Sequence, residues 1–144
     1  MQLLTDFPII IHQPVIWNDM DAYQHVNNTV YFRYFEDARM AFFEKTRVTE
    51  FKEQHGIGPI LASTRCDYRL PLTYPDQLHI GARVVEIAEK KFVMQYRVVS
   101  EKFNAIAAEG EGLIVYYDYK NARSCKIPDE ILLAIQGLST TPHI

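Results

Sequence analysis

Several features that would define the class of this protein at once are scarce or absent. Only two cysteines occur in 144 residues, Cys66 and Cys125. They form neither a CxxC pair nor a disulfide framework, so a reducing cytoplasm is the expected compartment. No apolar run approaches the roughly 20 residues that a membrane-spanning helix needs. The start of the chain has no basic stretch followed by an apolar one, so no signal peptide is predicted.

Positive charge is also in short supply. Lys and Arg number 15 against 18 Asp and Glu, and the net charge is -3. Nucleic acid is therefore not an expected partner, because phosphate binding depends on an excess of cations. A phosphate group could meet a few of the cations, namely Lys90, Lys91, Arg65, Arg69 and Arg123, but solvated surface charge is the better explanation of each.

Common catalytic motifs are missing as well. The sequence has no GxSxG elbow of a serine hydrolase, no P-loop and no GxGxxG turn. Its five histidines do not have the spacing of metal ligands. We therefore expect neither a metal nor a separate cofactor.

What is present is an ordinary globular composition, with 48% hydrophobic and 23% charged residues. This length is typical of one domain, and we predict a single domain over 1–144. A chain of this size can bury a substantial core without disulfides or metals.

Hydrophobic periodicity predicts one long helix over 29–45, with Asn27 or Asn28 as its N-cap. Its apolar face is formed by Tyr31, Phe35, Ala38 and Phe42. A shorter helix is expected over 49–55 and a closing helix over 129–136. Strands are predicted over 9–17, 60–70, 78–87, 92–99 and 105–119. Gly110 and Gly112 inside the last strand suggest a bulge or a strong bend.

The order of these elements indicates an α+β fold, in which an antiparallel sheet of about five strands wraps around one long helix. Such a sheet has two edges that must be protected from uncontrolled pairing. Pairing with a second copy would cover one edge, so we expect a homodimer or a homotetramer.

A polar loop lies directly before the long helix and gathers groups that could carry chemistry: Asp19, Asp21, Gln24, His25, Asn27 and Asn28. The first amides of a helix lack partners within the helix and carry partial positive charge. They could bind an oxyanion on an acyl carbonyl while a nearby carboxylate attacks that carbonyl or activates water. Caps and Asx-turns are the alternative explanation of such a cluster, and His25 could be structural.

Three segments of the sequence together resemble a known signature. VIWNDMD (15–21), HVNN (25–28) and YFRYFEDAR (31–39) resemble the pattern D-x-D-x-x-G-H-V-N-N-x-x-Y-x-x-x-x-E-x-x-R of the 4-hydroxybenzoyl-CoA thioesterase-like family. DYRLPLTYPD (67–76) is similar to a second stretch of that family, and the order of strands agrees. The resemblance implies a hotdog fold and hydrolysis of an acyl-CoA thioester, with coenzyme A as part of the substrate.

The resemblance also assigns roles to individual residues. Asp21 corresponds to the catalytic nucleophile or general base, and we interpret Asp19 as structural. His25 is expected to orient the loop or the substrate. Asn27 and Asn28 would hold the loop. The remaining implied positions are the oxyanion amide near Asn28 and Thr29, the pocket residue Tyr31, and a second pocket wall from strand 60–70 of another copy.

Two rival functions remain open at this point. One is a hotdog hydratase or dehydratase acting on acyl thioesters, and the other is an acyl-CoA binding protein without activity. The sequence also departs from the family pattern at Gln24, where a glycine is usual, and at Tyr74 to Asp76. Because a glutamine lacks the freedom of glycine at positive φ, the loop is expected to differ from that of the family.

Overall fold

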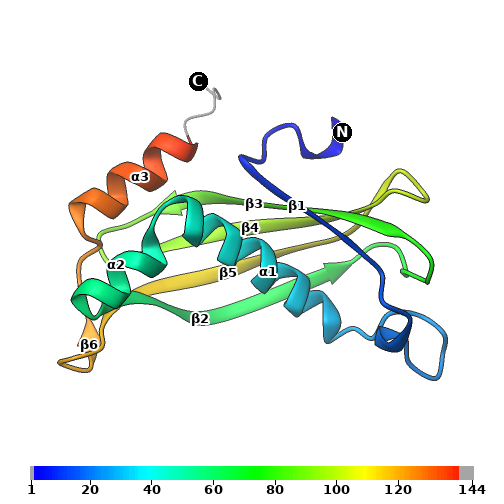
Figure 1. The fold of residues 1–144 in the computed structure, drawn as a ribbon, viewed down its shortest axis with the longest axis horizontal. Helices are drawn as coiled ribbons and strands as arrows, with labels where there is room; N and C mark the ends of the chain where they lie inside the picture. Colours follow the sequence, from blue (N-terminus) through cyan, green and yellow to red (C-terminus); the bar gives the residue numbers. More distant parts are fainter. Residues whose placement is uncertain (1, 140–144) are drawn as a thin grey trace.

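The computed structural model describes residues 2–139, and its central feature is a sheet curled around one long helix (Figure 1). The elements are η1 (Gln2–Leu4), β1 (Ile9–Pro14), η2 (Trp17–Asp19), α1 (Val30–Lys45), α2 (Val48–His55), β2 (Ile57–Tyr68), β3 (Gln77–Ile87), β4 (Lys91–Ser100), β5 (Ala105–Asp118), β6 (Arg123–Ser124) and α3 (Asp129–Ser139). Each predicted helix and strand is present, with bounds shifted by a few residues. The short elements η1, η2 and β6 were not predicted.

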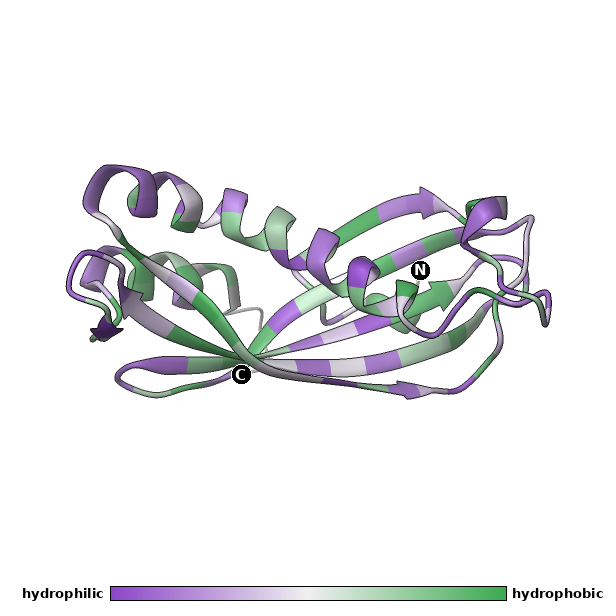
Figure 2. Cartoon of the chain, turned by 90° about the horizontal axis from the view of Figure 1, so that it is seen from below, coloured by the Kyte–Doolittle hydropathy of each residue, from purple (hydrophilic) through white to green (hydrophobic). Residues whose placement is uncertain are grey.

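The main sheet is antiparallel and has the strand order β1-β3-β4-β5-β2, with β6 paired to β5. β1 and β2 are therefore the two edges. The curled sheet follows α1 along its length, which Figure 2 shows from below. This arrangement confirms the predicted α+β architecture.

The core lies between α1 and the concave face of the sheet, as the periodicity predicts. The helix buries its predicted apolar face together with Tyr34 and Phe43. Alternate residues of β3 and β4 face it: Leu78, Ile80, Ala82, Val84, Phe92, Met94, Tyr96 and Val98. Apolar side chains at a period of 3.6 meet apolar side chains at a period of two, and burying both faces stabilises the layered structure.

Gly110 and Gly112 have a different role from the one predicted. The register of β5 with β2 continues without interruption through both glycines, and the irregularities lie elsewhere. A Cβ on Gly110 would lie 2.3 Å from Cε2 of Phe35. On Gly112 it would lie 2.8 Å from the hydroxyl of Tyr96. A bulge at these glycines is therefore wrong, because the strand pairing is uninterrupted, while a strong bend stays a prediction. The glycines make room for aromatic side chains on the concave face.

Among the described residues, no helix combines the length and the apolar character that crossing a membrane requires.

Candidate active site

The polar loop before α1 folds into a tight turn that displays Asp21. Met20 and Val26 form an antiparallel bridge, and the amide of Asp21 donates to the carbonyl of His25 at 3.0 Å. The amide of Gln24 donates to the carbonyl of Asp21 at 2.9 Å. One carboxylate oxygen of Asp21 accepts a bond from the amide of Tyr23 at 2.9 Å, which fixes the side chain. Asp21 is exposed, so its carboxylate is accessible to a substrate.

Gln24 closes the turn in a left-handed backbone conformation. Its φ is 65°, which is the left-handed conformation that glycine adopts most readily. A short hairpin of this kind commonly needs one left-handed residue after its turn. The glutamine therefore holds a conformation that favours glycine, at a cost in backbone strain, and a difference from the family's loop stays a prediction.

Asp19 has the structural role assigned to it. Its carboxylate forms an ion pair with Arg33 on α1, and its carbonyl accepts a bond from the amide of Asn27 at 2.9 Å. The loop is thus tied to the helix at Asp19. Asp21, two residues on, has no such ion pair among the described residues.

The start of α1 leaves one backbone amide unused. The side-chain oxygen of Asn27 accepts bonds from the amide and the hydroxyl of Thr29, both at 3.0 Å. The carbonyl of Asn27 accepts a bond from the amide of Val30 at 3.0 Å. The N-cap of α1 is Thr29, not the predicted Asn27 or Asn28, because the helix begins at Val30. Asn27 instead holds the backbone just before the helix, and the amide of Thr29 is already engaged. Within residues 2–139, the amide of Asn28 donates no hydrogen bond.

Two neighbouring hollows flank the turn. Asp21 lines a hollow of about 540 Å³ together with Trp17, Asn18, Met20, Gln24, Thr73 and Tyr74. His25, Asn28 and Tyr31 line another of about 310 Å³ with Val26, Tyr68, Arg69, Leu70 and Pro71. Asp21 and His25 are paired through their backbones, so each hollow is lined by one residue of this pair. The structure thus brings His25, Asn28 and Tyr31 together and puts Asp21 beside them, while Asn27 and Thr29 bond to each other at the entry to α1.

The segment between β2 and β3 braces this loop. The carbonyl of Leu72 accepts a bond from the amide of Val26 at 2.9 Å. The carbonyl of Asp76 does the same for the amide of Val15, also at 2.9 Å. The carboxylate of Asp76 is held in turn by the hydroxyl of Ser100 and by the amides of Gln77 and Lys102. The second sequence motif therefore supports the first.

Burial keeps the phenol and the thiol near this site neutral. Removal from water raises the pKa of Tyr31 to about 12. It also raises the pKa of the Cys66 thiol to about 11. At neutral pH the phenol can donate a hydrogen bond but cannot act as a base. A nucleophile must be the thiolate rather than the thiol, so Cys66 is a poor candidate beside the accessible carboxylate of Asp21.

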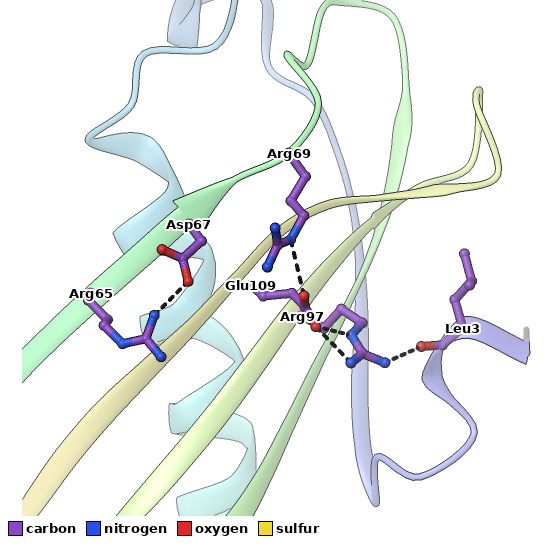
Figure 3. A network of polar contacts seen from close by, with 6 residues as sticks. All are labelled: Leu3, Arg65, Asp67, Arg69, Arg97 and Glu109. Atoms are coloured by element: carbon purple, nitrogen blue, oxygen red, sulfur yellow. Dashed lines mark hydrogen bonds and ion pairs between the residues drawn. The ribbon is translucent and has the colours of Figure 1, made fainter.

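Arginines on the sheet near the site are paired with carboxylates (Figure 3). Arg69 and Arg97 both contact Glu109, and Arg97 also donates to the carbonyl of Leu3. Arg65 pairs with Asp67. These pairs favour the interpretation of Arg65 and Arg69 as balanced surface charge. No group of three or more His, Cys, Asp or Glu residues in the described part of the chain is arranged to hold a metal ion.

Three aromatic residues belong to the hollows but were not singled out from the sequence. Trp17, Tyr68 and Tyr74 are 65%, 47% and 51% exposed. An exposed aromatic side chain beside a hollow is a signal for binding, but the sequence alone does not tell which aromatics will be exposed.

Comparison with known proteins gives the site its context. The model of the thioesterase-like superfamily matches residues 15–135. The chain is 24% identical over 112 residues to the long-chain acyl-CoA thioesterase FadM of Escherichia coli, covering 78% of this chain and 85% of FadM.

Solved structures agree with that match. A thioesterase of Thermus thermophilus in complex with coenzyme A and Zn superposes with a TM-score of 0.82 at 28% identity, covering 95% of this chain and 98% of that one. The PA2801 protein of Pseudomonas aeruginosa gives 0.78 at 31% identity, with 90% and 98% covered. The curled sheet around one helix is thus the hotdog fold expected from the sequence.

Proposed function

The chain belongs to the thioesterase-like superfamily, and on that premise we propose that it hydrolyses an acyl-CoA thioester to a free acid and coenzyme A. The carboxylate of Asp21 attacks the thioester carbonyl or activates a water molecule beside it. The amide of Asn28 donates to the oxyanion that develops on that carbonyl. Coenzyme A enters as part of the substrate, and no separate cofactor takes part.

One observation carries this proposal. An exposed, fixed carboxylate and an unused amide at the start of a helix lie on either side of one backbone-paired turn. The amide of Asn28 lies just before the N-terminus of α1, where the positive end of the helix favours negative charge, so it is suited to stabilise an oxyanion. The reacting carbonyl would sit between the carboxylate of Asp21 and the amide of Asn28, next to His25, which orients the substrate.

The active unit in this proposal is a homo-oligomer. β2 is an edge strand, and its residues from Leu61 to Tyr68 are exposed apart from the half-buried Cys66. A second copy that pairs along this edge would cover the open side of the smaller hollow, which Tyr68 and Arg69 line.

The two free thiols, Cys66 and Cys125, fit a reducing compartment, and we assign the protein to the cytoplasm.

The test is release of free thiol from a panel of short, long and aromatic acyl-CoAs, followed by the same assay on Asp21→Asn. We expect kcat to fall by roughly 100-fold or more, in line with loss of a catalytic acid–base group, while the fold persists. Asp129→Asn is the matched control, because Asp129 is an exposed carboxylate on α3, at the far end of the sheet from the loop (Figure 1). Parent-like turnover in Asp21→Asn would refute the role of Asp21.

A further inference from the structure

Tyr68, at the end of β2, reaches across to the start of α1. Its hydroxyl donates to the carbonyl of Asn28 at 2.9 Å. Its ring lies edge-on to that of Tyr31, with ring centroids 4.9 Å apart and an interplanar angle of 87°. Burial is the largest cause that raises the pKa of Tyr68, so the phenol is protonated at neutral pH and remains a donor. Two contacts thus link β2 to the first turn of the helix.

The peptide that Tyr68 holds is fixed at both ends. Its carbonyl, on Asn28, accepts the bond from Tyr68, and its N–H, on Thr29, donates to the side chain of Asn27 at 3.0 Å. The preceding peptide is fixed through its carbonyl on Asn27, which accepts a bond from the amide of Val30 at 3.0 Å. In a planar trans peptide the C=O and N–H bonds point in opposite directions. The N–H of Asn28 therefore points away from the helix.

We propose that Tyr68 is a positioning residue that holds the backbone around Asn28, so that the free amide faces the smaller hollow in a fixed direction. This inference rests on the proposed function, in which that amide binds the oxyanion. Donors that are fixed in advance need no rearrangement when the charge develops, which is how such groups lower the barrier. The other bonds around Asn28 come from neighbouring residues, whereas Tyr68 anchors the segment to the sheet.

Removing only the hydroxyl of Tyr68 separates positioning from packing. In Tyr68→Phe the ring contact with Tyr31 can persist, and the side chain is 47% exposed, so little stability should be lost. Tyr119→Phe is the matched control. The hydroxyl of Tyr119 donates to the carbonyl of Pro59 at 2.7 Å, also on β2, and its side chain is 42% exposed.

We expect kcat of Tyr68→Phe to fall about 10-fold, equivalent to about 1.4 kcal/mol of transition-state stabilisation, with KM within about twofold of the parent. Tyr119→Phe should match the parent in both constants, and the melting temperatures of all three proteins should agree. In amide NMR spectra, the signals of Asn28 and Thr29 should shift in Tyr68→Phe and stay in place in Tyr119→Phe.

The possible contrary results are distinct. Equal kcat in the two phenylalanine variants, with Asp21→Asn inactive in the same assay, would overturn the role of Tyr68 and leave the proposed function intact. A parallel loss of kcat, substrate affinity and melting temperature in Tyr68→Phe would assign Tyr68 a general structural role and also overturn the inference. Absence of thiol release by the parent across the whole acyl-CoA panel would overturn the proposed function and this inference together.

Discussion

At the scale of single residues, Gln24 combines a long side chain with a backbone conformation that glycine adopts most readily. It closes the turn that displays Asp21 and has a φ of 65°. A residue with a Cβ adopts this conformation at a cost of roughly 1 kcal/mol or more. Glycine carries no such steric cost but loses more entropy on folding. The difference between the steric cost of glutamine and the entropy cost of glycine decides whether replacing Gln24 by glycine raises or lowers the free energy of unfolding.

Gln24→Gly is expected to stabilise the protein by up to about 1 kcal/mol, because relief of the left-handed strain exceeds the added entropy cost. Urea unfolding measures this as an increase in the free energy of unfolding. Gln24→Ala keeps the strain and serves as the control, with no expected gain. A lower stability in Gln24→Gly would mean that side-chain contacts of Gln24 outweigh its backbone strain.

At the scale of elements, the contact between α1 and β5 determines how closely the helix lies on the sheet. Phe35 of α1 stacks on Tyr96 of β4, with centroids 4.9 Å apart. Gly110 leaves the space for this pair, because a Cβ there would lie 2.3 Å from Cε2 of Phe35. The same Cβ would lie 2.5 Å from the carbonyl oxygen of Arg65. A backbone atom cannot easily move aside, so the position tolerates no larger residue.

Gly110→Ala should destabilise the protein by about 1–3 kcal/mol or more, the usual range for overpacking a core.

Gly137→Ala is expected to have the opposite effect on stability. Gly137 lies in α3, and a Cβ there would meet nothing within 4 Å. Since alanine favours helix over glycine, that variant should gain up to about 1 kcal/mol. Thermal unfolding of both variants checks the contrast, and a harmless Gly110→Ala would show that α1 can shift on the sheet.

At the scale of the whole molecule, the two edges of the sheet are protected to different degrees. β1 has six residues and ends at Pro14, and a proline at an edge discourages pairing. β2 has twelve residues, pairs only with β5 among the described strands, and exposes both faces along much of its length. We therefore predict that a second copy pairs along β2 rather than along β1.

The expected mass in light scattering is about twice or about four times 16.8 kDa, for a dimer or a tetramer. Ala62→Pro should shift the mass toward the monomer, because proline removes an edge N–H. Ala62 sits in the register shift between Leu61 and Ser63 and has no partner residue in β5, so the pairing of β2 with β5 should survive. Ala62→Gly is the control. A monomeric parent, or an unchanged mass in Ala62→Pro, would contradict pairing along β2.

The sequence by itself determined those features that depend on neighbours along the chain. Helical spacing predicted the buried face of α1, and alternation predicted the inward residues of β3 and β4. The polar loop before the helix predicted where Asp21 and His25 would be displayed. These properties follow from the local geometry of helices and strands, which repeats at fixed periods.

Only the tertiary structure decided which distant residues meet. Tyr68 reaches Asn28 across 40 positions, and Leu72 holds Val26, because the curl of the sheet brings the end of β2 to the start of α1. The same curl explains Gly110, which the sequence suggested as a bulge and the structure shows as space for Phe35. Such contacts depend on strand register and sheet curvature, which arise from the packing of the whole chain rather than from any local pattern.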